Sequence, residues 1–340
     1  MNLGRSLLRS AGPVVGQGGG LPRPPSQRVN PGRGLGRYLG PLGFVLLCLL
    51  PLPFDNYVRA VLWQIGIYVL LGLSLHIIVG YTGMFQLGHA AFYAIGAYTV
   101  GILNLRAGWP IVLTLPVGAG LAGICGYMVC RPILHLRGDY LAIVTIAFGE
   151  IVRILLVNDA GGWTGGANGL SGIARPAIGG YVLRTNLGHF YLVLAVVLLT
   201  IAAVRRLENS RLGRAWMYVR EDESAAEAMG IDTVRVKSLA FFLGSAGAGL
   251  AGGLYACRVS VISPDLARFQ ESVTIFCIVV LGGCGSIPGV LVGTLAMVAL
   301  PELMRVVREW RDGFLGLAMI LMMIFRPGGL WPRRSSGSGT

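Results

Sequence analysis

The sequence predicts an all-α integral membrane protein, and three observations support this class. Hydrophobic residues make up 54% of the chain, only 13% of the residues are charged, and glycine occurs 52 times. Soluble domains carry about 25% charged residues, so this chain has too little charge to cover a folded surface in water. Several apolar runs approach the ~20 residues that a helix needs to cross a bilayer, and they are too long for barrel strands.

About ten membrane-spanning helices are expected from these runs. They cover residues 38–54, 60–80, 84–104, 110–130, 139–157, 187–204, 238–257, 272–284, 287–305 and 312–326. We therefore expect a transmembrane domain over 38–332, followed by a flexible tail at 333–340. Residues 1–37 are rich in Gly, Pro and Arg, which predicts a disordered cytoplasmic tail. A start site assigned too early would give the same composition.

The basic residues predict the orientation. The net charge is +13, and in a membrane protein an excess of Arg marks cytoplasmic loops more readily than a nucleic-acid surface. With the N-terminus inside, the inner segments hold most of the Arg residues, including those of 1–37 and 205–237. The residues that oppose this arrangement, because they fall in outer loops, are Arg175, Arg184, Arg305, Arg308 and Arg311. We predict a multi-pass protein of the inner membrane with both termini in the cytoplasm.

A long polar segment, residues 205–237, separates two apolar runs and holds seven basic and six acidic residues. Ser224 and Glu227 have the S-x-x-E spacing of a capping box. Gly230 can then end the helix in a left-handed conformation, and Asp232 is placed to cap the next helix. The spacing predicts a short cytoplasmic helix over 224–229.

This helix is expected to dock on a partner protein. Its small apolar face is suited to a partner's groove and consists of Ala225, Ala226, Ala228 and Met229. A solvated loop helix is the alternative interpretation.

Glycine-containing stretches interrupt two of the apolar runs. The first holds Gly80, Gly83 and Gly88 together with the polar residues Gln86 and His89. The second, residues 281–289, holds Gly282 and Gly285. Interrupted helices expose backbone amides and carbonyls that can bind a polar solute, whereas close helix packing is the alternative. Both breaks fall on the cytoplasmic side, which argues against their being mates of one inverted repeat unless a segment is re-entrant.

Glu150 and Arg153 lie three residues apart in the 139–157 run and therefore on one helix face. Ionisable residues at membrane depth face the bundle interior or a cavity. We interpret them as a self-compensating ion pair, with a role in the solute path as the alternative. The glycine-rich outer loop between 158 and 186 is long enough to cover a pore mouth, or it is simply flexible.

No catalytic or metal-binding motif is found in the sequence. It has no HExxH, GxSxG or Walker A sequence, so an ATP-driven mechanism requires another subunit. We expect a transport subunit without catalytic residues, metal or cofactor. A proton-coupled transporter acting through Glu150 or His89 is a second hypothesis, and a membrane enzyme is a third.

Several segments resemble permeases of branched-chain amino-acid ABC transporters, the LivM type. They are GMFQLGHAAFYAIGAY (83–98), GDYLAIVTIAFGEIVRIL (138–155), GGANGLSGI (165–173), EDESAAEAMGIDTVRVKSLAFFLGSAGAGLAGGLYA (221–256), VVLGGCGSIPGVLVGTL (279–295) and IFRPGGLW (324–331). The similarity covers roughly residues 40 to 332 and keeps the order of the family. One departure is Gln86, where relatives often have a small hydroxyl, so a urea or short-amide solute is the alternative.

The resemblance implies a bundle of the ABC importer permease fold with inverted repeats. It also implies a second homologous permease, two cytoplasmic ATPases that bind ATP and Mg, an extracytoplasmic solute-binding protein, membrane lipid around the bundle, and no nucleic acid. The segment that couples to the ATPases falls on Glu223, Ala225, Ala226, Glu227 and Gly230. The glycine-broken segment falls on Gly83, Gln86, Gly88 and His89, and the outer loop on Gly165, Gly166, Asn168 and Gly169.

Overall fold

The computed structural model describes residues 55–134, 139–159, 161–178, 181–182 and 185–303, with a few positions between 313 and 331. All of them belong to one unit, residues 50–340. The expected span 38–54, most of the span 312–326 and both expected tails lie outside the described residues.

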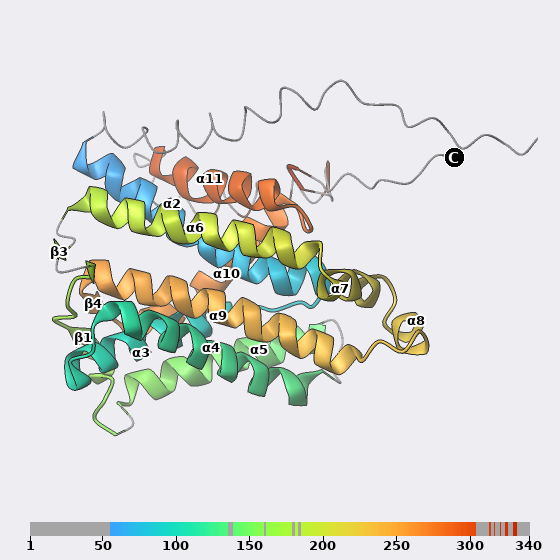
Figure 1. Cartoon of the computed structure of the whole chain (residues 1–340), viewed down its shortest axis with the longest axis horizontal. Helices are drawn as coiled ribbons and strands as arrows, with labels where there is room; N and C mark the ends of the chain where they lie inside the picture. The colour runs from blue at the N-terminus through green and yellow to red at the C-terminus, as the bar shows by residue number, and fades with distance from the viewer. Residues whose placement is uncertain are drawn as a thin grey trace, which may run out of the picture. The chain divides into compact units, whose positions relative to one another are not determined.

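Helices dominate the described part of the chain (Figure 1). The helical elements are α2 (Asn56–Leu75), the π-helix η1 (His76–Tyr81), α3 (His89–Ala107), α4 (Ile111–Ile133), α5 (Asp139–Val157), η2 (Gly166–Asn168), α6 (Asn186–Glu208), α7 (Arg211–Glu221), α8 (Glu223–Ala228), α9 (Thr233–Val259), η3 (Pro264–Ala267), α10 (Phe269–Gly282) and α11 (Ile287–Leu303). Within this part, five helices are long and apolar enough to cross a membrane: Asn56–Tyr81, Ile111–Ile133, Tyr140–Val157, Asn186–Glu208 and Thr233–Val259.

Helix α9 is the centre of the bundle and packs against α2, α3 and α4. Small residues make this packing close. A Cβ atom added at Gly96 of α3 would overlap the backbone of Gly249, and one at Gly252 would overlap the carbonyl of Tyr93. Without an aqueous driving force between membrane helices, such close approach is what holds them together.

One predicted boundary is wrong: the helix expected over 84–104 begins only at His89, because residues 83–88 are not helical. The span expected over 238–257 lies within α9, which begins at Thr233 after the predicted cap Asp232 and ends at Val259. The run expected at 272–284 forms α10, whose 14 residues span about 21 Å, short of the ~30 Å hydrocarbon core.

Short antiparallel ladders lie at the end of the bundle opposite α7 and α8 (Figure 1). Strand β1 (Leu170–Ser171) pairs with β4 (Val261–Ile262), which directly follows α9. Strand β2 (Ala177–Ile178) pairs with β3 (Tyr181–Val182). The loop after α5 is thus tied to the end of α9, and the expectation that it is merely flexible is wrong for this part of it.

Candidate transport and coupling site

The first glycine break connects η1 to α3 through residues 83–88. Gly83 has φ +71, a conformation that glycine adopts at little cost. A Cβ at Gly88 would overlap the carbonyl oxygen of Thr145 in α5. The Leu87 amide donates to Thr145 Oγ1 over 3.1 Å. The break is therefore a defined, packed segment that lies against α5.

Two polar side chains of this break are buried with hydrogen-bonding capacity left over. Gln86 is 1% exposed, and neither of its amide atoms has a hydrogen-bond partner among the described residues. His89 is fully buried; its Nε2 lies 2.8 Å from Ser74 Oγ, while its Nδ1 has no partner in the same part of the chain. Buried polar groups are nearly always hydrogen-bonded, so these atoms have hydrogen-bonding capacity that the described residues leave unused.

The second break, between α10 and α11, differs from the first. Gly283 and Gly285 have φ +112 and +107, as expected of a glycine turn. The carbonyls of Leu281 and Gly282, however, accept hydrogen bonds of 3.0 and 3.1 Å from the amides of Leu330 and Trp331. A Cβ at Gly282 would also overlap Gly289. Close packing, the alternative interpretation, therefore describes Gly282, and its carbonyl already has a partner within the chain.

The polar segment 205–237 forms two helices, where the sequence predicts one. Helix α7 precedes α8, and the Ser210 side chain caps its start by accepting from the Gly213 amide over 3.2 Å. The predicted capping box is wrong. The side chain that caps α8 is Asp222, which accepts from the Ala225 amide over 3.0 Å, so the helix begins at Glu223, one residue before the predicted start.

Gly230 ends α8 as expected, with φ +83. The Ile231 amide donates to the Ala226 carbonyl over 3.1 Å and the Gly230 amide to Glu227 over 2.9 Å, the pair of bonds that defines a Schellman motif. Asp232 caps α9, also as expected, by accepting from the Arg235 amide over 3.0 Å.

The exposed face of α8 is smaller than expected. Ala226 is 2% exposed and packs into the bundle, which contradicts its predicted place on a docking face. Ala225 and Ala228 are exposed, and Met229 is 72% exposed. These three residues are the small apolar surface that α8 presents.

Helix α7 connects α8 to the first glycine break. Trp216 is fully buried; its ring stacks on Tyr81 at 6.3 Å, and its Nε1–H donates to the Val236 carbonyl over 2.8 Å. Arg220 donates to the carbonyl of Gly80, and its side chain also packs against Gly83. Neither role was predicted from the sequence; a Trp inside a strongly charged segment is the signal that indicates an anchored helix.

Two polar contacts hold α8 against the start of α9. Lys237 is 8% exposed and forms an ion pair with Glu223. The Thr233 hydroxyl donates to Glu227 Oε1 over 2.7 Å, so Glu227 does not reach back to the start of α8 as a capping box requires. Lys237 is the only lysine in the chain, and its role too was missed from the sequence.

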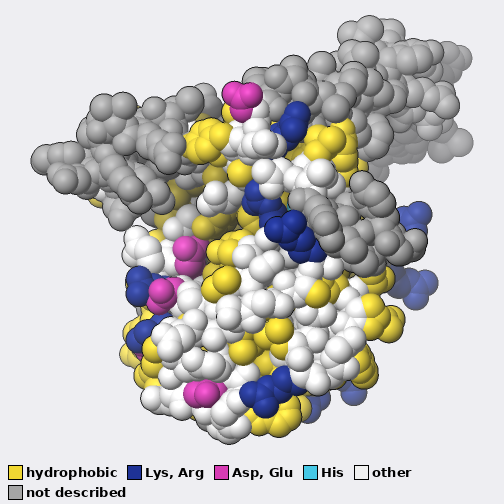
Figure 2. Space-filling model, turned by 90° about the vertical axis from the view of Figure 1, so that its left-hand side faces the viewer, with side chains coloured by type: hydrophobic (Ala, Val, Ile, Leu, Met, Phe, Trp, Pro, Cys, Tyr) yellow, Lys and Arg dark blue, Asp and Glu magenta, His cyan; other side chains and the backbone are white. Residues whose placement is uncertain are grey.

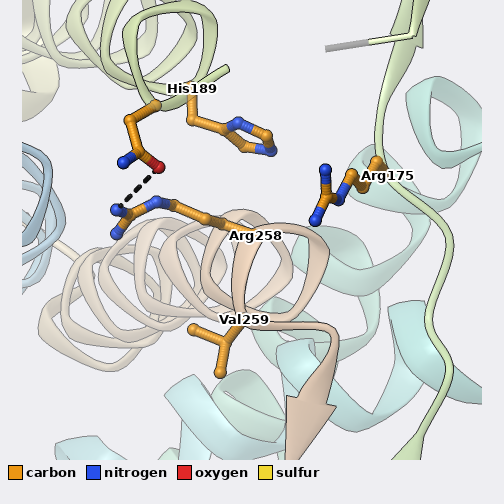
Figure 3. Close-up of a pocket in the computed structure, with 5 residues that line it drawn as sticks. Arg175, His189, Arg258 and Val259 are labelled. Carbon is orange, nitrogen blue, oxygen red and sulfur yellow. Dashed lines mark hydrogen bonds between the residues drawn. The ribbon is translucent and has the colours of Figure 1, made fainter. Parts of the chain in front are cut away.

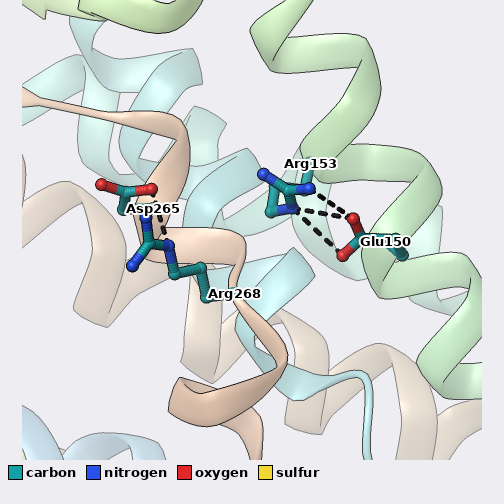
Figure 4. A network of polar contacts seen from close by, with 4 residues as sticks. All are labelled: Glu150, Arg153, Asp265 and Arg268. Carbon is teal, nitrogen blue, oxygen red and sulfur yellow. Dashed lines mark hydrogen bonds and ion pairs between the residues drawn. The ribbon is translucent and has the colours of Figure 1, made fainter.

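Glu150 and Arg153 form an ion pair on α5, near the pair that Asp265 and Arg268 form around η3 (Figure 4). Arg153 Nε lies 2.9 and 3.1 Å from the two Glu150 carboxylate oxygens. The Arg153 side chain is 32% exposed, and the Glu150 side chain is 43% exposed. The expectation that they face the interior of this bundle is therefore wrong: the pair lies on the surface of the chain.

The outer loop is shaped by its glycines and by one carboxylate. Gly165, Gly166 and Gly169 all have positive φ, and a Cβ at Gly169 would overlap the backbone of Ile262. Asn168 is exposed. Hydrogen bonds from the Thr164 amide and hydroxyl hold the pKa of the Asp159 carboxyl below its usual value, because they stabilise the charged form.

Comparison with known proteins supplies the remaining evidence. Residues 57–323 match the family described as "Branched-chain amino acid transport system / permease component". The chain belongs to this family. The resemblance inferred from the sequence is therefore confirmed, and the protein is a transport component without catalytic function. Among the described residues, no cluster of His, Cys, Asp and Glu could hold a metal ion.

The chain is also similar to individual permeases with assigned names. The chain is 42% identical to the high-affinity branched-chain amino acid permease LivM of Escherichia coli, over 78% of this chain and 68% of that protein. It is 27% identical to a probable LivM of Methanocaldococcus jannaschii, over 82% and 94%. It is also 27% identical to LivH of E. coli, over 78% and 91%. No solved structure matches the chain.

Proposed function

We propose that this permease is the membrane-spanning subunit of an inner-membrane ABC importer for branched-chain amino acids, driven by separate ATPases that bind α8. The observation that carries the proposal is the contact chain from α8 through α7 to the first glycine break. Family membership gives the solute class and the transport role. The contact chain supplies the route by which an ATPase outside the membrane moves the solute path inside it.

The proposed coupling route runs from α8 to α7 and from α7 to η1. Helix α8 is fixed to α9 by the ion pair of Glu223 with Lys237, and it begins where α7 ends, at Asp222. Helix α7 in turn contacts η1 through Trp216 and Arg220. A push on the exposed residues of α8 therefore moves α7 against η1. A π-helix is a strained segment that is frequently found at functional sites, and here it leads directly into the break.

The solute path is proposed to pass the first break at Gln86 and His89. Their unpartnered atoms can accept hydrogen bonds from the ammonium group of a zwitterionic amino acid or donate hydrogen bonds to its carboxylate. The backbone of residues 83–88 is not helical and adds further donors and acceptors. The second break contributes less, because the amides of Leu330 and Trp331 occupy its carbonyls.

An exposed ion pair on α5 indicates where a partner protein binds. A half-exposed ion pair, Glu150 with Arg153, is costly against lipid. We propose that a second, homologous permease covers this face of α5, and the similarity to both LivM and LivH supports paired permeases. We further propose that the permease has about ten spans with inverted repeats and that both termini are cytoplasmic. Its other partners are two ATPases that bind ATP and Mg, and an extracytoplasmic solute-binding protein.

Leucine uptake into proteoliposomes tests the coupling. The complex is reconstituted with Met229→Glu or Gly230→Pro in this chain, and ATP-dependent uptake of labelled leucine is measured. Met229→Glu places a charge on the exposed face without affecting the core, and proline cannot adopt the φ of +83 found at Gly230. Both variants are expected to insert normally into the membrane. They should lose most of the uptake, and the ATPases should no longer co-purify with them.

The matched control is Arg211→Glu, an exposed charge change on α7 that lies away from α8, which is expected to leave uptake unchanged. Ala226 is not a suitable test position, because its burial means that a charge there disrupts folding. Uptake by the Met229→Glu and Gly230→Pro complexes at the rate of the control would show that α8 is only a connector.

The solute assignment has its own test at Gln86. Gln86→Ser introduces the small hydroxyl that relatives often carry, and it removes the unpartnered amide from the path. We expect the KM for leucine to change several-fold while the amount of complex stays constant. Uptake of urea or acetamide in preference to leucine by the unaltered complex would instead support a short-amide permease.

A further inference from the structure

One side of α4 is exposed and apolar along the length of the helix. Its large apolar side chains that are 40% to 67% exposed are Val112, Leu113, Val117, Leu121, Ile124 and Met128. From Leu113 to Met128 they recur every three or four residues, which places them on one side of the helix. Helix α4 holds no charged residue before Arg131. Neither the coupling route nor the solute path proposed above uses this side.

The length of this apolar side matches the thickness of a bilayer. The 23 residues of α4 span about 34 Å, against ~30 Å for the hydrocarbon core. Trp109, which is 45% exposed, lies directly before the helix, and Tyr127 lies near its other end. Because Trp and Tyr are enriched at the two membrane–water interfaces, the apolar side is bounded as expected of a surface that lies in lipid.

The exposed side of α5 is different, because it carries charge. Glu150 and Arg153 are partly exposed there, and Glu150 lies near the middle of the span Tyr140–Val157. Charge at that depth is costly against lipid, whereas the exposed side of α4 has none. Figure 2 views the molecule from the end opposite α7 and α8, and it shows acidic and basic side chains on that end and hydrophobic side chains along its flanks. Lipid rather than protein is therefore the favoured cover of α4.

Arg131 lies at the end of the bundle that carries α7 and α8. Helix α4 is antiparallel to α9, since a Cβ atom added at Gly249 would overlap Ala122, while one at Gly126 would overlap the Ser245 hydroxyl. The last turn of α4, which holds Arg131, is thus beside the start of α9. The apolar side of α4 ends at a basic residue on this end of the bundle.

Most hydrogen-bond donors of Arg131 are unused within the described part of the chain. The side chain is exposed; its Nη2 donates to Tyr127 Oη over 2.9 Å, and the guanidinium lies 5.0 Å from the centre of that ring. Among the described residues, no carboxylate lies within ion-pair distance of Arg131. A guanidinium has five N–H donors, and the Tyr127 hydroxyl, which accepts here, keeps its own hydrogen for another acceptor.

Arg258, at the other end of the bundle, shows that an arginine near a helix end can instead be used within the chain. It donates from α9 to Asn186 of α6, between the two helices (Figure 3), and it lies over the Trp63 ring of α2. The contact of Arg131 stays within its own helix and is exposed, so its charge is presented to the surroundings of the bundle.

We propose that α4 binds an anionic phospholipid, with the phosphate at Arg131 and Tyr127 and an acyl chain along Met128 and Ile124. The planar donor array of a guanidinium matches a phosphate, and the Tyr127 hydroxyl can donate a further hydrogen bond. Basic residues near the surface of a membrane attract anionic lipids. The proposed orientation places this site in the cytoplasmic leaflet, while the binding itself depends on neither the orientation nor the transported solute.

Photolabelling of the full complex tests the proposal. The complex is placed in nanodiscs of phosphatidylcholine with increasing mole fractions of a phosphatidylglycerol whose acyl chain carries a photoreactive group. Mass spectrometry of peptides then measures the labelling of α4. Arg131→Gln is expected to raise the mole fraction for half-maximal labelling about fivefold, the effect of one basic residue near the surface. Arg131→Lys keeps the charge, and Tyr127→Phe keeps the ring, so both should give a smaller rise.

The matched control is Arg106→Gln. Arg106 is also exposed and lies over an aromatic ring, 5.3 Å from the centre of Trp163, but it belongs to the last turn of α3. Its replacement is expected to leave the labelling of α4 unchanged. Since Arg131 and Arg106 are both exposed, we expect both variants to fold, which thermal unfolding of the complexes verifies.

Three results would overturn the proposal. Equal half-maximal mole fractions for Arg131→Gln and Arg106→Gln would show that Arg131 does not bind the phosphate. Equal labelling of α4 by a photoreactive phosphatidylcholine would show that the negative charge of the lipid is not recognised. Absence of label on α4 in the unaltered complex, together with label on other helices, would show that a partner protein covers this side.

Discussion

The two ends of α9 carry buried or half-buried basic residues, yet their surroundings differ. At the start of the helix, Lys237 is paired with Glu223, and Asp232 caps the first turn. At its end, Arg258 contacts the amide oxygen of Asn186 and the Trp63 ring, with no carboxylate in ion-pair distance among the described residues. Among the described residues, a carboxylate compensates the charge at the first end, and none does so at the second.

The difference distinguishes a charged residue that fixes two elements of the chain together from one that does not. A buried charge is retained when a partner and hydrogen bonds compensate its lost hydration. Where the chain itself supplies the partner, as for Lys237, the residue fixes one element against another. At the other end of α9, Arg258 instead contacts the Asn186 amide oxygen and the Trp63 ring. The comparison predicts large stability effects at the start of α9, where the charge of Lys237 is compensated by Glu223.

The largest effect is expected from Trp216→Ala, which removes the anchor of α7. Truncation of a fully buried Trp costs about 3–5 kcal/mol, and here it also frees the Val236 carbonyl. Thermal unfolding of the purified complex measures the change. Trp216→Phe keeps most of the stacking on Tyr81 and is expected to lose much less. Equal stability of the Ala variant and the unaltered protein would show that α7 is not docked.

The next effect concerns the ion pair of α8 with α9. Lys237→Met removes the ammonium group beside Glu223, and Glu223→Gln removes the negative charge beside the more deeply buried Lys237. Removal of one member of a fully buried pair costs about 3–5 kcal/mol, and we expect about 1–3 kcal/mol because Glu223 is 25% exposed in its side chain. The double variant should recover part of the loss in a double-mutant cycle. Additive losses would show that the two residues act independently.

A smaller effect distinguishes the observed cap of α8 from the predicted one. Asp222→Ala removes the side chain that accepts from the Ala225 amide and should cost about 1 kcal/mol. Ser224→Ala changes the residue that the sequence pattern selects, which is exposed and is expected to have almost no effect. The two melting temperatures, measured side by side, decide between the caps; a greater loss for Ser224→Ala would restore the capping box.

The smallest effect is expected at the outer loop and depends on pH. The pKa of Asp159 lies below its usual value of 3.8, so the charged carboxylate stabilises the loop above that pH. This stabilisation is lost as the pH falls through the lowered pKa of the folded state. Amide exchange at Thr164 and Gly165, corrected for the intrinsic rate, should therefore increase below about pH 4. Asp159→Asn should show no such dependence.

The sequence by itself determined the class of the protein, the positions of most helices and both glycine breaks. These features depend on local composition: apolar length for a span, and glycine for a positive φ at Gly83 or Gly230. The family resemblance was equally readable, because it rests on several segments in order. The cap of α9 at Asp232 follows from its spacing alone.

Tertiary structure alone decided which polar residues have partners. The spacing indicates Ser224 as the cap of α8, and only the backbone path between α7 and α8 selects Asp222. Ala226 faces the bundle because α7 and α9 fix the rotation of α8. The hydrogen bond between Arg258 of α9 and Asn186 of α6 joins residues that are 72 positions apart. No local pattern encodes such a meeting, since it depends on how the helices pack.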